Sequence, residues 1–316
     1  MSCYVVMGFG AAGAATARLL VEQGHAVRVV TRSGRAAEPG IEHVALDATD
    51  PAGLTGVAEG ADAILQCAAP PYDRWASDLP PLAASACAAA EATGAVLVML
   101  GNLYGYGPVD GPMTEDLPLS ATGHKGRVRA AAWEQARTLH EQGRIRAVEV
   151  RACDFFGPGV TDGGHLAARV MPALLRGRPV STLGDPDAPH SWTYLPDVAR
   201  ALAEVAGTER AWGRAWHVPT EPALSVRQMV ERLAAETGTG PVPVRGLPAA
   251  VLTVGGLFSP LLRELKEIRH QFTSPFVIDA SAYEAAFEVR ATPLDQQAKA
   301  TVGWWRERLA DAARRP

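Results

Sequence analysis

The first half of the chain alternates short, almost continuous apolar runs with longer stretches in which apolar residues recur every three or four positions. Runs of the first kind predict buried strands, and stretches of the second kind predict helices. Strands are expected at Tyr4–Met7, Ala26–Thr31, Glu42–Leu46, Ala63–Gln66, Val96–Leu100 and Arg146–Arg151. Helices are expected at Ala11–Gln23, Pro51–Glu59, Leu79–Thr93 and Lys125–Gln142. Because apolar strands separated by helices are typical of a parallel sheet covered on both faces, we expect a doubly wound α/β fold of the Rossmann type.

The pattern loosens after Phe156, where Gly- and Pro-rich connections separate the apolar segments. Amphipathic helices are still expected at Leu166–Arg176, Val226–Thr237 and Pro293–Arg308. We therefore expect a Rossmann domain over residues 1–156, to which 190–220 return, and a smaller mixed α/β C-terminal lobe over 157–316 that mainly binds the substrate.

A glycine-rich turn follows the first apolar run, with the sequence Gly8-Phe9-Gly10-Ala11-Ala12-Gly13 before a helical stretch. This G-x-G-x-x-G spacing between a strand and a helix is typical of dinucleotide binding, because the glycines allow a tight turn, close approach to a pyrophosphate and close helix–strand packing. The helix N-terminus adds free N–H groups and a dipole that favours negative charge. We therefore expect Gly8, Gly10, Ala12 and Gly13 to bind a dinucleotide, the alternative being a glycine turn without a ligand.

The residues at the end of the second strand indicate which nicotinamide cofactor is bound. NAD sites place an acidic residue there for the ribose 2′-hydroxyl, whereas an Arg accommodates the 2′-phosphate of NADP. This chain has Thr31-Arg32-Ser33, with Arg35 close behind and no acid. A guanidinium can form a charge-assisted fork with a phosphate, so the segment favours NADP. The alternative is that both arginines are surface charges of a loop.

Composition sets limits on partners and location. The chain has 316 residues, 47% of them hydrophobic and 20% charged, with a formal net charge of −4. This balance gives no electrostatic reason to expect a nucleic acid or a membrane as partner. The apolar stretch Leu247–Leu262 is broken by Pro and Gly, and the first strand begins too near Met1 for a signal peptide, so we expect a cytoplasmic protein. The four cysteines lie far apart in the sequence, and no Cys/His cluster suggests a metal.

Several motifs, in this order, resemble those of the extended short-chain dehydrogenase/reductase superfamily, in its NAD(P)-dependent epimerase/dehydratase branch. They are the glycine turn, Leu46–Asp50, Cys67–Ala69, Leu103–Gly105, Arg151–Gly159 and Trp192–Ala199. The resemblance covers nearly the whole chain. It implies that Asp47 and Ala48 contact the adenine, that Ala68 and Ala69 lie beside the cofactor, and that the helices expected at Leu79–Thr93 and Lys125–Gln142 pair in a homodimer.

The chain departs from this family at the catalytic residues. Members use a Ser or Thr, a Tyr as general acid/base, and a Lys four residues later that holds the nicotinamide ribose and lowers the pKa of the Tyr. Lys125 matches the Lys, but Leu100 occupies the Ser/Thr position and Ala121 the Tyr position. The stretch Thr122–Lys125 also resembles the progesterone 5β-reductase/iridoid synthase family, which moves its Tyr to the segment after strand six. No Tyr is evident in that segment here.

Other polar residues are therefore candidates for the missing roles. Asn102 occupies the place where sugar dehydratases carry an acid, and we expect it to hydrogen-bond a substrate. Tyr104, Tyr106 and His124 are titratable groups near it in the sequence, and Asp154 is expected at the carboxyl end of a strand, where doubly wound folds bind ligands. Each of these residues also has a purely structural interpretation. We select Lys125, Asn102, Tyr104 and Asp154 as candidate catalytic residues.

Three functions remain open from the sequence. The first is an NADP-dependent oxidoreductase that acts on a carbonyl or hydroxyl group of a small molecule with a non-standard proton donor. The second is a redox-neutral epimerase, dehydratase or cyclase-like enzyme, and the third is a non-enzymatic NADP sensor. Lys125 and Asn102 weigh against the sensor, while the missing Tyr and Ser weigh against the oxidoreductase.

Overall fold

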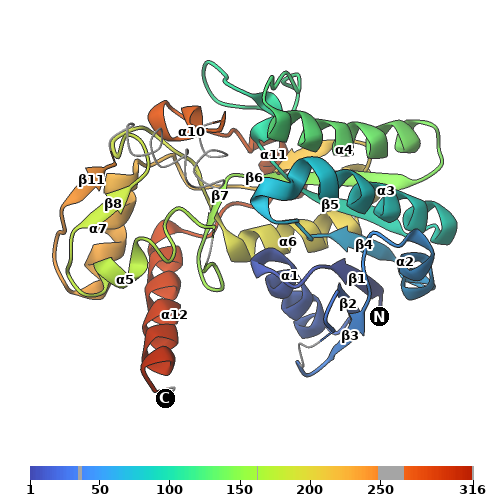
Figure 1. The fold of residues 1–316 in the computed structure, drawn as a ribbon, viewed down its shortest axis with the longest axis horizontal. Helices are drawn as coiled ribbons and strands as arrows, with labels where there is room; N and C mark the ends of the chain where they lie inside the picture. Colours follow the sequence, from blue (N-terminus) through green and yellow to red (C-terminus); the bar gives the residue numbers. More distant parts are fainter. Residues whose placement is uncertain (35–37, 162, 248–266, 315–316) are drawn as a thin grey trace. The chain divides into compact units, whose positions relative to one another are not determined.

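The computed structural model describes residues 1–34, 38–161, 163–247 and 267–314 (Figure 1). Arg35 and nearly all of the apolar stretch Leu247–Leu262 lie outside the described residues. The chain forms two compact units. Unit 1 consists of Met1–Gly107, Glu115–Ala152 and Val198–Val218, and unit 2 of Pro108–Thr114, Cys153–Asp197 and Pro219–Pro316.

Unit 1 is built on a seven-stranded sheet in the order β10-β6-β5-β4-β1-β2-β3. Its strands are β1 (Cys3–Met7), β2 (Ala26–Thr31), β3 (Ile41–Ala45), β4 (Ala63–Gln66), β5 (Val96–Asn102), β6 (Arg146–Ala152) and β10 (Ala215–His217). Every neighbouring pair is parallel. The expected Rossmann-type sheet is therefore confirmed. Because the strand order reverses between β1 and β4, the carboxyl ends of these two strands mark the place where such folds bind ligands.

Helices cover both faces of this sheet. They are α1 (Ala11–Glu22), α2 (Pro51–Ala58), α3 (Trp75–Thr93), α4 (His124–Glu141) and α6 (Leu195–Ala206), with 3-10 turns η1 (Tyr72–Arg74), η2 (Tyr104–Tyr106) and η3 (Glu209–Ala211). The first four agree with the predicted helices to within a few residues. Helices α2, α3 and α4 share a buried apolar cluster with β1, β4 and β5, whereas α1 and α6 lie on the other face (Figure 1).

Local sequence explains two of the helix ends in unit 1. Asp50 caps α2 by accepting a hydrogen bond from the N–H of Ala52 at 3.1 Å, and Gly94 ends α3 with a φ of 71°. The predicted start of α3 at Leu79 is wrong, since the helix begins at the buried Trp75. It continues through two prolines, Pro80 and Pro81, which have no N–H to donate to the preceding turn.

Unit 2 contains two small parallel sheets and several helices. β7 (Asp154–Phe156) pairs with β9 (Trp192–Tyr194), and β8 (Val180–Thr182) pairs with β11 (Val244–Gly246). The helices are α5 (Met171–Leu174), α7 (Val226–Thr237), α10 (His270–Thr273), α11 (Ser281–Phe287) and α12 (Leu294–Arg314). The helix expected at Leu166–Arg176 is reduced to α5, whereas α7 has the expected bounds and α12 extends beyond the expected helix.

Among the residues that the structure describes, no helix has both the length and the apolar character needed to cross a membrane.

Candidate active site

The glycine loop after β1 is held by contacts that only glycine permits. Gly8 has a φ of 89°, and a Cβ there would lie 2.8 Å from the Cα of Ala68. A Cβ at Gly13 would lie 2.1 Å from the carbonyl oxygen of Gly8. The first and third glycines therefore bring α1 and the end of β4 against the loop.

Gly10 differs from the other two glycines because a Cβ there would meet no atom within 4 Å. It is the N-cap of α1, and no side chain caps this helix. The N–H groups of the first turn have no acceptor within the helix, so they are available to an anion in front of it. Ala12 is buried in this turn. The loop thus fits a dinucleotide pyrophosphate, with open space at the second glycine.

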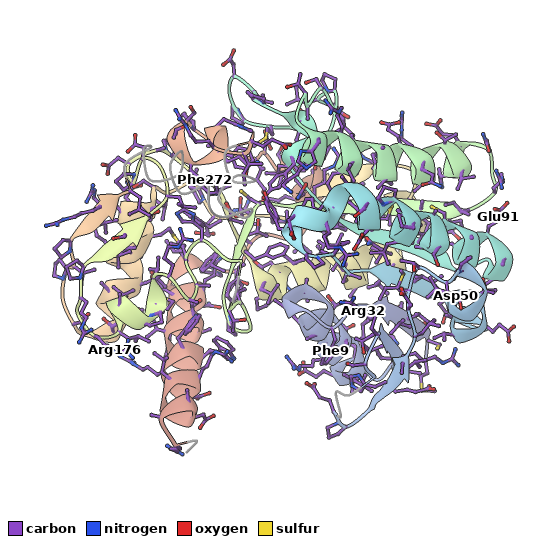
Figure 2. The ribbon with its side chains drawn as sticks, in the orientation of Figure 1. Phe9, Arg32, Asp50, Glu91, Arg176 and Phe272 are labelled. Atoms are coloured by element: carbon purple, nitrogen blue, oxygen red, sulfur yellow. The ribbon has the colours of Figure 1, made fainter. Side chains whose placement is uncertain are left out.

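The segment after β2 presents a positive charge and no carboxylate of its own. Arg32 is exposed (Figure 2), as is Ser33. The hydroxyl of Thr31 accepts a hydrogen bond from the N–H of Gly34 at 3.1 Å. The pKa of Asp47 is lowered by hydrogen bonds from Thr49 and also by the positive charge of Arg32. Arg32 and Asp47 are therefore neighbours, although they are 15 positions apart in sequence.

The segment after β4 lies close to the glycine loop in space. The side-chain amide of Gln66 donates to the carbonyl oxygen of Ala68 at 2.9 Å, and Ala69 is exposed. Ala48, after β3, packs against the core cluster. These alanines lie at the carboxyl ends of their strands, where small side chains leave room for a bound ligand.

Lys125, Asn102 and Tyr104 come together at the carboxyl end of β5. Asn102 is the last residue of β5, and its side-chain oxygen accepts a hydrogen bond from the N–H of Tyr104 at 3.2 Å. Lys125, the second residue of α4, is fully buried. Its ammonium group donates to the carbonyl oxygen of Tyr72 and lies 3.9 Å from the centre of the Tyr72 ring.

Tyr72 is a functional candidate that the sequence analysis missed. Its phenolic oxygen is 3.4 Å from that of Tyr104, and its ring packs edge-on against Trp75 with centroids 5.1 Å apart. Trp75 also stacks on Tyr104, and the guanidinium carbon of Arg129 lies 4.3 Å from the centre of the Trp75 ring. Two phenols, an ammonium group and a guanidinium therefore share one aromatic cluster. No motif of fixed spacing in the sequence points to Tyr72, because its contact with Lys125 joins residues 53 positions apart.

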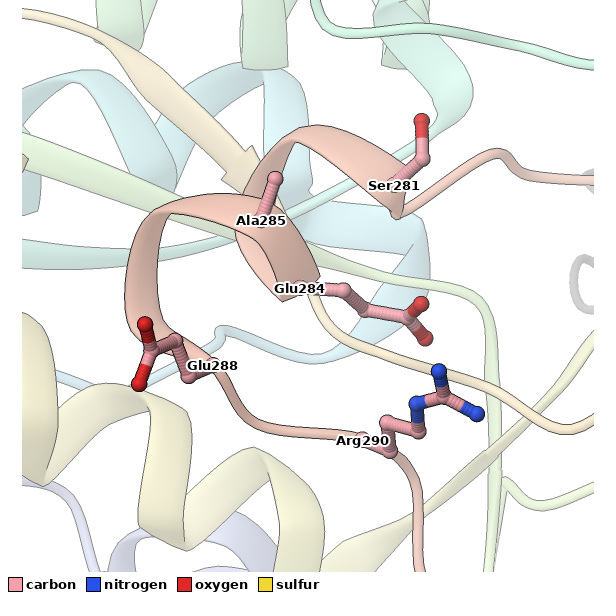
Figure 3. Close-up of a pocket in the computed structure, with 5 residues that line it drawn as sticks. All are labelled: Ser281, Glu284, Ala285, Glu288 and Arg290. Carbon is pink, nitrogen blue, oxygen red and sulfur yellow. The ribbon is translucent and has the colours of Figure 1, made fainter.

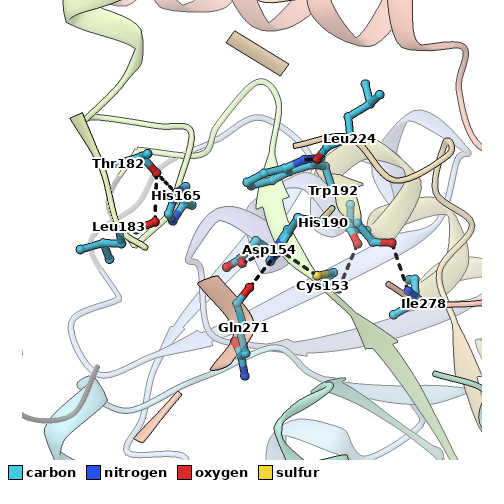
Figure 4. A network of polar contacts seen from close by, with 12 residues as sticks. Cys153, Asp154, His165, Thr182, Leu183, His190, Trp192, Leu224, Gln271 and Ile278 are labelled. Carbon is cyan, nitrogen blue, oxygen red and sulfur yellow. Dashed lines mark hydrogen bonds and ion pairs between the residues drawn. The ribbon is translucent and has the colours of Figure 1, made fainter. Parts of the chain in front are cut away.

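Asp154 belongs to unit 2, where it begins β7. Its Oδ2 is 2.8 Å from Nε2 of His190, and its side chain is 19% exposed (Figure 4). Burial acts to raise the pKa of Asp154, but the hydrogen bond from His190 and the charge of that residue outweigh it, so the pKa is lowered. Burial raises the pKa of the neighbouring Cys153 thiol well above its usual value.

The model of one family matches residues 4–216, which is two thirds of the chain. The chain belongs to the NAD dependent epimerase/dehydratase family. The resemblance inferred from the motifs is thereby confirmed, and with it the expectation that the chain is an enzyme of this type. No curated protein sequence matches it.

Several solved structures, among them an epimerase and a dehydratase, have the same fold as this member of the family. The Bordetella bronchiseptica enzyme WbmH in complex with NAD+ is 19% identical with a TM-score of 0.73, covering 97% of this chain and 99% of that one. UDP-glucose 4-epimerase of Thermotoga maritima, with UDP-glucose, is 16% identical with a TM-score of 0.79 over 97% and 99% of the two chains. The dTDP-glucose 4,6-dehydratase DesIV of Streptomyces venezuelae is 20% identical with a TM-score of 0.77 over 98% of each chain.

The motifs match Ala121 and Leu100 to the two positions of the family's catalytic hydroxyls, and this assignment stays a prediction. Ala121 lies against the turn after β5, where its N–H donates to the carbonyl oxygen of Gly105 at 3.0 Å. Leu100 accepts a hydrogen bond from Arg129 through its carbonyl oxygen at 3.2 Å. Neither side chain can donate a proton, so under this assignment the proton donor is a different residue.

Tyr106 and His124 were further candidates for that donor. Tyr106 is fully buried, accepts a hydrogen bond from Arg151 at 2.6 Å and is 2.7 Å from Nε2 of His217. Burial raises its pKa to about 12. These contacts enclose the phenol and assign it to a structural network. His124 is half-buried and begins α4 directly before Lys125.

A separate hollow lies on unit 2, beside α11. It has a volume of about 440 Å³ and is lined by Ser281, Glu284, Ala285, Glu288 and Arg290 (Figure 3). None of its lining residues is among those selected above as candidate catalytic or cofactor-binding residues.

Proposed function

We propose that this family member is an NADP-dependent oxidoreductase that moves a hydride to or from the carbonyl or hydroxyl carbon of a small molecule. The observation that carries the proposal is the cluster of Lys125, Tyr72 and Tyr104 at the carboxyl end of β5. The glycine loop supports the cofactor part of the proposal.

The geometry of unit 1 supports the following cofactor contacts, which belong to the proposal. The loop of Gly8, Gly10 and Gly13 and the N-terminal turn of α1 would hold the pyrophosphate. Arg32 and Ser33, with the Thr31 backbone, would hold the 2′-phosphate, and Asp47 with Ala48 would face the adenine. Ala68, Ala69 and Lys125 would line the nicotinamide end. When bound, the cofactor supplies a carbon that accepts or donates hydride.

Tyr72 is the proton donor in this proposal, in place of the missing Tyr at Ala121. Its phenolic oxygen gives a proton to the substrate oxygen, and the phenol of Tyr104 is near enough to relay another proton to it. The ammonium group of Lys125 lies over the Tyr72 ring, so it stabilises negative charge that develops on the phenol. Asn102 would hydrogen-bond the substrate, although the structure also gives it a role in shaping the turn.

A first test concerns cofactor choice. We expect NADPH to bind about tenfold more tightly than NADH, a difference of about 1.4 kcal/mol. Arg32→Asp should reverse this preference, because it replaces a phosphate-binding fork with a carboxylate that suits a ribose hydroxyl. Titration of each cofactor by fluorescence measures both constants. Arg176→Asp makes the same charge change on unit 2 and should leave the preference intact, while equal affinities in the wild type would contradict the assignment.

A second test concerns Lys125. We expect Lys125→Met to lower turnover about tenfold or more, because the substitution keeps the volume but removes the charge beside Tyr72. Steady-state rates of NADPH oxidation with a panel of carbonyl compounds measure the loss. Lys299→Met removes an exposed lysine from α12 and serves as the control. Full activity of the folded Lys125→Met variant would show that the site has been misplaced.

The family assignment supports a second candidate function, a redox-neutral epimerase or dehydratase in which the cofactor is reduced and reoxidised within one turnover. The structures of similar fold include enzymes bound to NAD with UDP-glucose or dTDP. The carbonyl panel separates the two functions, since a redox-neutral enzyme converts its substrate without net consumption of NADPH. Tight NADPH binding without turnover of any kind would instead favour the sensor.

The homodimer formed through α3 and α4 and the cytoplasmic location stay predictions.

A further inference from the structure

Three potential metal ligands meet within unit 2. Among the described residues, Cys153, Asp154 and His190 place one sulfur, one carboxylate oxygen and one imidazole nitrogen within 4.8 Å of one another (Figure 4). Sγ of Cys153 is 3.5 Å from Nε2 of His190, and Oδ2 of Asp154 is 2.8 Å from the same nitrogen. Folding thus assembles a mixed S, N, O donor set that is not visible as a spacing in the sequence.

The backbone around these ligands is fixed by regular pairing. Asp154 begins β7, which pairs with β9 in parallel so that Asp154 lies opposite Trp192. The N–H of Cys153 donates to the hydroxyl of Thr193 at 3.0 Å. His190 stands two residues before β9. Two neighbouring strands therefore set the distances between the donor atoms, as a preformed site requires.

The His190 ring is oriented as metal-binding histidines usually are. Nδ1 faces the carbonyl oxygen of Gln271 at 3.2 Å, so this nitrogen carries a proton and donates it. Such a bond to a backbone carbonyl fixes the tautomer and directs Nε2 toward a metal. Trp192 and Phe276 pack on the ring at centroid distances of 4.4 and 5.4 Å. The ring therefore cannot turn away from Cys153 and Asp154 without losing these contacts.

The two distances from Nε2 of His190 suit zinc, one of them after a small adjustment, and the sulfur and carboxylate oxygen lie within 4.8 Å of each other. In a tetrahedral zinc site, a thiolate sulfur and an imidazole nitrogen are about 3.5 Å apart, which agrees with the separation of Cys153 and His190. The distance from His190 to Asp154 is that of a hydrogen bond, and it has to lengthen by roughly 0.5 Å when a metal replaces the bridging proton. Binding would release that proton and the thiol proton of Cys153.

We propose that Cys153, Asp154 and His190 bind one zinc ion and leave its fourth position to a water molecule or an oxygen atom of a ligand. The combination of a thiolate with imidazole selects zinc over magnesium or calcium, which prefer oxygen ligands. The partly exposed side of Asp154 gives access to the open position. This inference does not depend on the proposed oxidoreductase function, because it concerns residues of unit 2 alone.

The test is a titration of the tag-free, metal-stripped full chain with Co²⁺ and then Zn²⁺. We expect one equivalent of Co²⁺ to give the near-ultraviolet thiolate charge-transfer band and the visible bands of a tetrahedral site, and Zn²⁺ to displace it. Cys153→Ser should abolish the charge-transfer band, and Asp154→Asn and His190→Ala should weaken binding about tenfold or more. Cys87→Ser, at a buried cysteine of α3, should change nothing.

Absence of the charge-transfer band in the wild type at micromolar protein and metal would overturn the proposal, as would its persistence in Cys153→Ser. Thermal unfolding of the wild type gives a second readout that needs no variant, since zinc that binds the folded chain raises the melting temperature. If zinc left the melting temperature unchanged, Asp154 and His190 would be a hydrogen-bonded pair that binds no metal. NADPH affinity, measured in parallel, separates this outcome from a failure of the proposed function.

Discussion

Replacing Tyr72 with phenylalanine is expected to lower turnover by roughly 10²–10⁴-fold, the usual contribution of a general acid. The ring of Tyr72 contacts the Lys125 ammonium group, and its phenolic oxygen lies 3.4 Å from that of Tyr104. The substitution removes the transferable proton but keeps the ring that packs on Trp75. NADPH affinity should therefore stay the same while the rate of its oxidation falls. Stopped-flow measurement of a single turnover, together with a fluorescence titration of the cofactor, checks both parts.

Two control variants make this result specific. Tyr4→Phe removes a phenol from β1 and should leave turnover unchanged, whereas Tyr104→Phe should cause a smaller loss than Tyr72→Phe because it removes only the relay. If Tyr104→Phe were the more damaging change, Tyr104 would be the donor and Tyr72 its support. Full activity of Tyr72→Phe would remove the proposed proton path altogether.

The second large effect is on stability. We expect Glu149→Ala to lower the free energy of unfolding by about 3–5 kcal/mol, because it leaves the Arg151 guanidinium buried without its carboxylate partner. The two side chains are 2.6 Å apart and only 5% and 4% exposed. Burial acts against the charge of Arg151, but Glu149 and Tyr106 outweigh it and raise the pKa of the guanidinium. Urea unfolding followed by circular dichroism measures the change.

The chain offers a matched control for this pair. Glu91→Ala breaks the ion pair with Arg144, whose members are 38% and 50% exposed, and should have little effect because water replaces the lost partner. Glu149→Gln, which keeps an oxygen near Arg151, should recover part of the loss. A Glu149→Ala variant as stable as Glu91→Ala would mean that Arg151 finds another partner or reaches water.

Much of unit 1 could be predicted from the sequence, because its signals are local. The apolar runs form strands that helices cover whatever the order of the strands in the sheet. The predicted bounds of these strands therefore agree with the observed ones to within two residues. The glycine loop is also local. Gly13 contacts Gly8 five positions away, and this contact follows from the strand–turn–helix path itself.

Unit 2 was harder to predict because its elements are short and depend on their surroundings. The stretch Leu166–Arg176 has the spacing of an amphipathic helix, yet only α5, Met171–Leu174, is helical. A short helix gains little from its own hydrogen bonds, so tertiary packing decides where it forms.

The features of the candidate site also differ in whether local sequence predicts them. The sequence by itself determined the glycine loop between strand and helix and predicted a role for Lys125 and the loss of the usual hydroxyls at Leu100 and Ala121, since each depends on a motif of fixed spacing. Only the tertiary structure placed Tyr72 against Lys125, 53 positions apart, and His190 against Asp154, 36 positions apart. Such contacts are made between strand ends and loops that the sheet order brings together, and no local spacing encodes that order.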